Sequence, residues 1–409
     1  MKRILMLTLG VLTAIGGFVD IGDIVANATI GARYGLGLLW VLTLGVIGIC
    51  AFAEMSGRIV AVSGRPVFDL IRERLGPRVA LVNLAGSFLA TLLTLAAQIG
   101  GVAVVIQLAS GIPHIVWVIP AGLALWLVIW FVKFKRIEQV LGLSGLAVGV
   151  FGAAIWWLDP DWGALAGQAL SLGPAPDEPV PTYFYYAVTL FAATMTPYEV
   201  FFFSSGGAEE HWSRKDLGIQ RANVLLGFPL GGVLSVGIAG AAAVTLLPLG
   251  MDAETLGQVL LPAGIAFGLA GMAVAMFGFF ACMTGAAFET SMSCGYALAQ
   301  FFGWSWGKRE RPKRAARFHM SVAVVIVAAI AIVQTGVDPV MVTEVSLVAS
   351  AVALPLTYLP ILMVANDRVY LGRHVNGRFG NAVGTVIMVV VVVAAIAAVP
   401  LMIATGMGA

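Results

Sequence analysis

The stretch GFVDIGDIVANATIGARYG, Gly17–Gly35, is the segment on which the fold and function of this chain depend. It lies in an apolar run long enough to cross a membrane, yet it carries Asp20 and Asp23 around Gly22. A carboxylate at bilayer depth costs about 3 kcal/mol on insertion scales, so it requires a partner or a function. Gly22 is a point where a helix can unwind and expose oxygen ligands for hard cations. The alternative is a bend whose acids pair with a basic residue, but few Lys or Arg lie in apolar runs.

The composition is that of a membrane protein. The 409 residues are 60% hydrophobic and 11% charged, with a mean hydropathy of +0.97, whereas a soluble domain is about 25% charged. Repeated apolar runs of about 20 residues predict an all-α polytopic membrane protein. Cys50, Cys282 and Cys294 lie in apolar runs without metal-ligand spacing, so no disulfide framework is expected.

Eleven apolar segments are candidate spans, with the first broken at Asp20–Asp23 and the sixth near Thr196–Pro197. The N-terminus resembles a signal peptide, but no clear small-x-small cleavage site follows, so we interpret it as an uncleaved span. The eighth segment is too long for one crossing, and we expect its C-terminal part to leave the bilayer or lie along its surface. The expected spans are 3–34, 36–60, 79–108, 112–133, 138–157, 183–206, 220–248, 258–300, 316–335, 340–364 and 380–405.

The connections alternate in charge. Basic residues concentrate near 2–3, 58–78, 133–136, 214–221, 308–317 and 368–378. The other connections carry mainly acids, namely Asp159, Asp161, Asp177, Glu178, Asp252, Glu254 and Asp338. The positive-inside rule then predicts a multi-pass protein of the plasma (inner) membrane, with its N-terminus cytoplasmic and its C-terminus outside. The lipid bilayer is the expected partner, no nucleic acid is expected, and an oligomer is not required.

The two broken spans lie five spans apart. In LFAATMTPYEVFFFSSGG, Pro197 removes a backbone donor and obstructs the preceding turn. Interrupted helices at matching positions of two halves indicate an inverted-repeat transporter with a site at the membrane midplane. We therefore expect repeats at 1–157 and 183–364 and an additional helix at 380–405. The alternative for the sixth span is an ordinary proline kink.

Several motifs in a fixed order resemble the Nramp family of divalent-metal transporters. They are DIGD, GARYG and LLW between Asp20 and Trp40, then GRIVAVSGRPVFDLIRERLGPR, FKRIEQVLGL and LPLTYLPILMVANDR. The resemblance runs from the first span to about Arg368. It implies two inverted five-helix repeats of the LeuT/APC type.

The chain departs from the family pattern at the residues that would hold the metal. Asp20 matches the metal-binding aspartate of the family, but Ile21 replaces its proline and Asp23 its asparagine. In the sixth span the family has Ala-Thr-x-Met-Pro-His, and the methionine is a soft thioether ligand. Here the motif starts at Ala193, and Thr196 stands in place of that methionine.

These departures predict a site made of oxygen ligands alone. Asp20, Asp23, the Ala193 carbonyl and Thr196 suit Mg²⁺, Ca²⁺ or Mn²⁺. Met195 would restore a sulfur ligand only through a one-residue register shift. The pattern resembles the Nramp-related magnesium transporter branch. We therefore expect transport of Mg²⁺, and also Mn²⁺, as substrate, with no cofactor.

Proton coupling is not expected. By resemblance, proton-coupled relatives carry acids in the third span and histidines on the sixth. The corresponding residues here are Thr94, Ala97, Tyr198 and Phe203, which supply no carboxylate or imidazole. The alternative is a proton-coupled transporter of Mn²⁺ or other transition metals.

Six further polar residues are candidates for the pathway or for supporting the ligands: Asn27, Gln98, Tyr198, Glu199, Glu289 and Glu344. Asn27 shares a face with Asp23 if the helix has resumed there, and otherwise bonds another helix. Gln98 is the better candidate for an interhelical hydrogen bond. For Glu199 the alternative is exposure to water near a gate, and for Glu289 it is pairing with an arginine.

Three other functions are compatible with parts of this pattern. A Na⁺-coupled amino-acid symporter of the same fold would bind a carboxylate near the broken helix, where Asp20 and Asp23 would repel it. A membrane enzyme is not expected, because the chain shows no nucleophile–base constellation, phosphate loop or zinc motif. A passive channel would share the acids but would not need two matched helix breaks.

Overall fold

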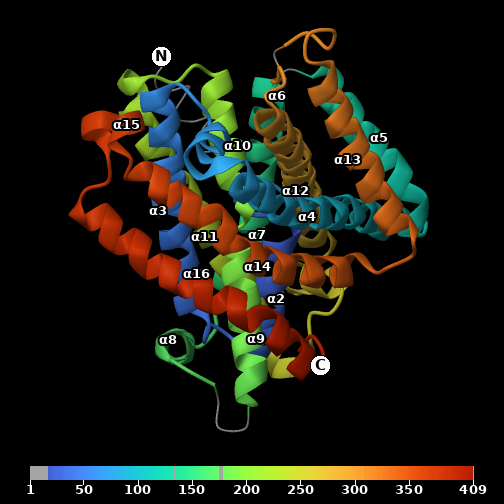
Figure 1. Ribbon diagram of the computed structural model, residues 1–409. Coiled ribbons are helices and arrows are strands. Elements are labelled where there is room, and N and C mark those ends of the chain that lie inside the picture. The colour runs from blue at the N-terminus through green and yellow to red at the C-terminus, as the bar shows by residue number, and fades with distance from the viewer. Residues whose placement is uncertain (1–16, 133, 175–177, 309, 409) are drawn as a thin grey trace.

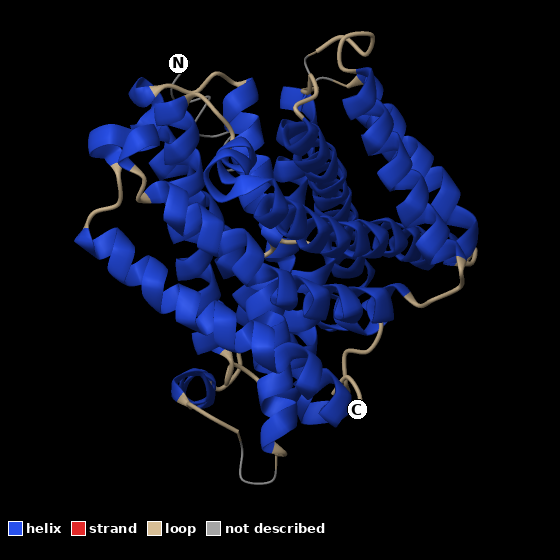
Figure 2. Ribbon diagram, in the orientation of Figure 1, coloured by secondary structure: helices blue, strands red, loops and turns tan. Residues whose placement is uncertain are grey.

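The computed structural model describes residues 17–132, 134–174, 178–308 and 310–408, and these residues form helices and connections without a strand (Figure 2). Nine helical segments in these ranges are long and apolar enough to cross a membrane. They are α3 (Leu39–Ser63), α4 (Val67–Ser110), α5 (His114–Phe131), the run Gln139–Leu158 within α6 (Phe134–Gly145), η1 (Leu146–Gly149) and α7 (Val150–Leu158), then α11 (Leu217–Thr245), α12 (Leu256–Phe302), α13 (Ala316–Gln334), α14 (Pro339–Ala365) and α16 (Arg378–Thr405). The expected all-α polytopic class is confirmed.

The sixth expected span is broken, as predicted. It forms α9 (Val180–Thr194) and α10 (Pro197–Glu209), with Met195 and Thr196 between them. The second half of the first expected span is α2 (Ile21–Tyr34). Residues 1–16, on which the signal-peptide interpretation depends, lie outside the described part of the chain.

The eighth span contains a break that the sequence analysis missed. At Gly268 the backbone of α12 has φ 61° and ψ −148°, and the helix folds back so sharply that a Cβ on Gly271 would lie 2.2 Å from the Ala263 carbonyl oxygen. Gly268 is in the left-handed half of φ space, which glycine adopts without a steric penalty. The eighth segment was expected to be too long at its C-terminal end, but the fold-back shows that some of its extra residues lie at the N-terminal end, before Gly268. The helix after Gly268 is still longer than one bilayer crossing.

Long-range packing places α2 in the interior. Figure 1 shows α4 crossing the molecule, and α4 packs along both α14 and α12. Helix α2 packs chiefly on α11 and also contacts α9, α12 and α14. Eleven of its fourteen residues are buried. Asp20 caps this helix and Asp23 lies in its first turn, and two buried carboxylates require partners.

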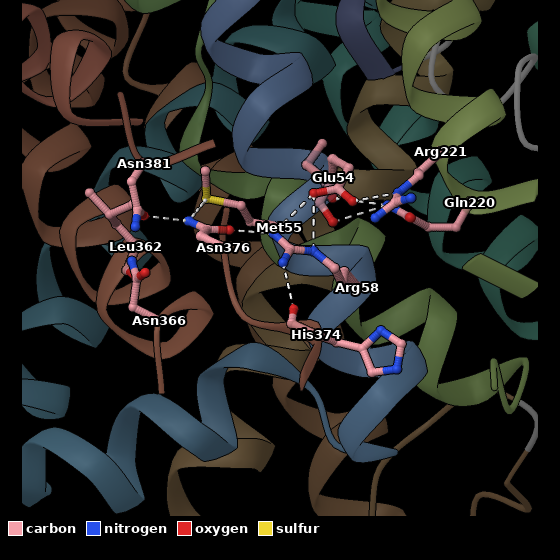
Figure 3. Close-up of polar contacts among 11 residues, drawn as sticks. Glu54, Met55, Arg58, Gln220, Arg221, Leu362, Asn366, His374, Asn376 and Asn381 are labelled. Atoms are coloured by element: carbon pink, nitrogen blue, oxygen red, sulfur yellow. Dashed lines mark hydrogen bonds and ion pairs between the residues drawn. The ribbon is translucent and has the colours of Figure 1, made fainter. Parts of the chain in front are cut away.

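The basic connections gather on one face. Arg58 of α3 donates to the His374 carbonyl and to Asn376, and it also pairs with Glu54, which Arg221 of α11 contacts at 2.9 Å (Figure 3). Other arginine contacts on this face join Arg72 to the Phe301 carbonyl and Arg74 to Asp367. The predicted alternation of basic and acidic connections is therefore also a spatial separation.

The opposite face carries the other connections. There the Tyr34 hydroxyl donates to Glu178 at 2.6 Å, and Thr29 donates to the Ala253 carbonyl at 3.3 Å. The short helix α8 (Trp162–Leu170) lies on this face, and Arg33 donates to the Gly408 carbonyl near the end of α16. We call the two surfaces the basic face and the acidic face.

Candidate metal site

The first helix breaks just before Asp20. This residue has an extended backbone, φ −101° and ψ −178°, and it caps α2 because its Oδ1 accepts from the Asp23 amide at 2.9 Å. The helix has already resumed at Ile21, so Gly22 is helical and is not the point of unwinding that its position suggested. A Cβ on Gly22 would lie 2.9 Å from Leu347 of α14, so close packing explains this glycine better than a hinge does.

The second break frees carbonyl oxygens. Thr196 is extended, with φ −65° and ψ 133°, and Pro197 begins α10 without an N–H. Pro197 is also the residue four positions after Ala193, so it offers no amide to the Ala193 carbonyl. The Tyr358 hydroxyl of α14 lies 3.2 Å from the Met195 carbonyl and 3.4 Å from that of Thr196. The carbonyls of Met195 and Thr196 therefore contact a side chain of α14 instead of bonding within a helix.

Tyr198 joins the two breaks. Its hydroxyl donates to the Gly17 carbonyl at 2.7 Å and lies 3.2 Å from Asp20 Oδ2. The Thr196 side chain is close enough to interact with the same hydroxyl. Since Tyr198 is in the first turn of α10, this contact holds the carboxylate of one broken helix against the start of the other.

Asp23 has a different set of partners from Asp20. Its Oδ2 accepts from the Ser235 hydroxyl of α11 at 2.5 Å, a short charge-assisted bond. Its Oδ1 accepts from the Asn27 amide at 2.9 Å, which confirms that Asn27 shares its face. Asp20 therefore faces α10, whereas Asp23 is bound between α2 and α11.

The remaining candidates divide between two places. The Oε1 of Gln98 accepts from the Ile21 amide at 3.2 Å, and its side chain is close enough to interact with the Asp20 carboxylate. Glu199 and Glu289 both reach Gly17 from α10 and α12. Glu344 instead lines a pocket of about 450 Å³ on the acidic face, and Leu347 is the α14 residue that meets Gly22.

Burial without a cationic partner is the electrostatic signature of this site. Asp20, Asp23 and Glu199 are at most 4% exposed, and no ion pair among the described residues involves any of them. A helix cap contributes about 1 kcal/mol, less than the several kcal/mol needed to bury a carboxylate. The bend with paired acids is therefore excluded for the described residues, and a bound cation would complete the balance.

The ligands available to such a cation are oxygens. Within the described ranges, no three His, Cys, Asp or Glu side chains lie close enough to hold a metal ion, so carbonyls, hydroxyls and water would have to contribute. The Met195 sulfur is turned toward α3, since Met195 Sδ would lie 2.5 Å from a Cβ on Gly48. The register shift that would supply a thioether is thus absent.

Two supporting residues were missed from the sequence. Ser235 and Tyr358 hold Asp23 and the second break, respectively. Each is a polar residue inside an apolar span, in GGVLSVG and PLTYLP, and such residues commonly bond between helices. That signal was present, but it does not say which helix each would meet.

Comparison with known proteins shows the family to which this chain belongs. Residues 10–400 match the family model described as natural resistance-associated macrophage protein-like, Nramp. The divalent metal cation transporter MntH of Ralstonia nicotianae is 25% identical over 407 residues, covering 94% of this chain and 88% of the relative. The protein of that name from Deinococcus radiodurans is 24% identical over 395 residues, covering 92% and 85%. These relatives are transporters rather than enzymes.

Solved structures show the same fold. A mutant of the Eremococcus coleocola manganese transporter superposes with a TM-score of 0.77 at 16% identity, covering 99% of this chain and 88% of that one. Mhp1, a nucleobase-cation-symport-1 family transporter, gives a TM-score of 0.60 at 15% identity, covering 96% and 91%. The expected inverted-repeat architecture agrees with both.

Proposed function

Because the chain belongs to the Nramp family, we propose that it is a multi-pass transporter of divalent metal cations that prefers Mg²⁺ and also accepts Mn²⁺. The observation that carries this proposal is the contact of Asp20 with Tyr198 across the two helix breaks. It puts a buried carboxylate, for which the described residues supply no basic partner, next to backbone oxygens that are free of helical pairing. A substrate cation supplies the missing charge, and Asp20, Asp23, the Ala193 carbonyl and Thr196 are its proposed ligands.

The preference for Mg²⁺ rests on the chemistry of the donors. Thr196 offers a hydroxyl where a thioether would favour softer metals, and Met195 Sδ packs on α3 instead. Mg²⁺ gives up water reluctantly and usually keeps several water ligands. The Nε2 donor of Gln98, close to Asp20, is suited to a carboxylate oxygen or a metal-bound water.

We propose that transport runs down the gradient of the metal and the membrane potential. The relay positions Thr94 and Ala97 carry no titratable group, and the Thr94 hydroxyl is bonded within its own helix to the Ala90 carbonyl at 3.0 Å. A potential of 100 mV acts on one charge with about 2.3 kcal/mol, and on a dication with about twice that. With the basic face cytoplasmic, this drives Mg²⁺ inward.

Proton-coupled transport is the second candidate, and one observation favours it. Glu199 is a buried carboxylic group beside the broken helices, at a position outside the relay inferred from the sequence. Protonation would neutralise the buried Glu199 carboxylate, just as a bound cation would. The two candidates differ in whether protons move with the metal.

The test is Mg²⁺ and Mn²⁺ uptake into proteoliposomes with the internal pH followed at the same time. We expect uptake of both metals, Mg²⁺ preferred, without internal acidification. Asp20→Asn should reduce uptake at least tenfold, because it removes the charge but keeps a helix-capping side chain. Asp161→Asn is the matched control, since Asp161 caps α8 by accepting from the Ala164 amide at 3.0 Å on the exposed surface. Unchanged uptake by Asp20→Asn would remove the site, and acidification would favour the proton-coupled candidate.

A further inference from the structure

Two carboxylates meet at Gly17, whose carbonyl accepts from the Tyr198 hydroxyl that also contacts Asp20. A Cβ on Gly17 would lie 2.2 Å from Glu289 Oε2 and 3.0 Å from Glu199 Oε1. The two acids come from α12 and α10, and their exposed fractions are 6% and 4%. Only glycine leaves room for both at this point.

Glu199 has a carboxylate oxygen that no group in the described part of the chain satisfies. Its Oε2 is buried without a hydrogen-bond partner, and no ion pair in the described ranges includes this residue. Its place in the first turn of α10 is favourable for a negative charge, but a helix dipole contributes at most about 2 kcal/mol. That is less than the penalty for burying a carboxylate, so either a proton on Glu199 or a bound cation must neutralise the group.

The surrounding groups offer more oxygen. The Gly17 carbonyl is held in place by the Tyr198 hydroxyl at 2.7 Å, and the Ser293 hydroxyl of α12 donates to the Tyr198 carbonyl at 3.2 Å. These bonds fix the relative positions of the first break, α10 and α12. A hard dication that keeps part of its water suits two carboxylates and a carbonyl.

We propose that Glu199, Glu289 and the Gly17 carbonyl form a second site for a hydrated divalent cation, between the central site and the basic face. Helix α10 leads in that direction, since Glu209 at its end accepts from the Lys308 amide at 2.8 Å. The proposal rests on the transport function proposed above. During transport the cation leaves Asp20, passes Tyr198 and binds the two glutamates. Their carboxylate oxygens replace some of the oxygen ligands that it loses at the central site.

The test counts Mn²⁺ ions bound to the purified full-length protein, by titration with the free ion followed by electron paramagnetic resonance. We expect two ions on the unmodified protein. Asp20→Asn should leave one ion, and the double variant Glu199→Gln/Glu289→Gln should also leave one. Glu310→Gln, the same change on an exposed residue of the basic face, should keep two. Thermal unfolding of each variant shows whether it is folded.

The outcomes separate the two sites. One ion on the unmodified protein, lost in Asp20→Asn and kept in the double glutamine variant, overturns the second site and leaves the central one. Loss only in the glutamine variant overturns the central site instead. Gly17→Ala provides an independent check, because the added methyl group must displace Glu289, and we expect the second ion to bind at least tenfold more weakly. Two ions of unchanged affinity in this variant would contradict the proposal.

Discussion

At the residue scale, the contrast between Thr196 and Met195 decides what kind of ligand the second break offers. The backbone turns between them, so that the Met195 thioether packs against Gly48 while Thr196 lies beside the Tyr198 hydroxyl. A sulfur ligand is thus one residue away in the sequence but on the wrong side of the chain. Selectivity at this site should respond to the side chain at position 196 and not to that at 195.

Thr196→Met should shift selection toward softer metals. A thioether at the break is a better ligand for Mn²⁺ or Cd²⁺ than for Mg²⁺, so we expect the uptake ratio of Cd²⁺ to Mg²⁺ to rise about tenfold, or about 1.4 kcal/mol. Competition of each metal against radioactive or fluorescent Mn²⁺ uptake measures this ratio. Met195→Leu conserves volume and is the control, and its ratio should stay at the original value. An unchanged ratio in Thr196→Met would argue that Thr196 is not a ligand.

The residues of the site were predictable where backbone chemistry fixes them. Pro197 was expected to break or kink the sixth span, and Asp20 in an apolar run was expected to need a partner or a function; the structure has a break before Pro197 and a helix cap at Asp20. Contacts between distant segments were not predictable. Ser235 is more than 200 residues from Asp23, and Glu289 reaches Gly17 only because α12 and the first break are brought together by packing. One sequence contains no information on that pairing beyond the presence of a polar residue in a span.

At the element scale, the packing of α2 on α11 positions Asp23. The two helices approach so closely that a Cβ on Gly31 would lie 2.2 Å from the Ala239 carbonyl oxygen. Backbone atoms cannot move aside as a flexible side chain does, so the whole of α2 would have to shift. The Ser235 hydroxyl on α11 would then lose its 2.5 Å contact with Asp23.

Gly31→Ala should therefore lower both stability and transport. Overpacking of this kind costs about 1–3 kcal/mol, and we expect a lower thermal unfolding temperature and at least a fivefold loss of Mg²⁺ uptake. Gly152→Ala in α7 is the control, because a Cβ there meets no atom within 4 Å and alanine favours a helix. Stability equal to that of the unmodified protein in Gly31→Ala would show that α2 is not held by this close approach.

Element boundaries show where a sequence pattern is insufficient. The nine long apolar helical segments of the described residues follow from length and hydropathy, because lipid requires backbone groups to be paired within a helix. The fold-back at Gly268 leaves that pattern unchanged, since apolar residues continue on both sides of it. At Gly22 the sequence pattern predicted a break that the structure does not have. Glycine is used for close packing as readily as for unwinding, and here it packs against Leu347.

At the scale of the whole molecule, the two faces differ in charge. Arginines tie α3, α11 and the connection before α16 together on the basic face (Figure 3). The pocket on the acidic face is lined by four acids, Asp252, Glu254, Asp338 and Glu344. Its one basic residue, Arg33, is already paired with Glu178 at 3.5 Å. The arrangement attracts cations to one face and restrains the helices on the other.

Neutralising the pocket should slow cation entry at low ionic strength. Like charges lining a cleft raise the local concentration of an oppositely charged substrate, an effect that salt screens. For Asp252→Asn/Glu254→Gln we expect at least a threefold increase in the KM for Mg²⁺ at low salt and an unchanged maximal rate, because neither residue contacts the central site. The increase should disappear near 1 M salt, where the Debye length is about 3 Å. Glu310→Gln on the basic face is the control, measured with Mg²⁺ added to the acidic face. An increase in KM that persists at high salt would mean that these acids bind the ion directly rather than attract it from a distance.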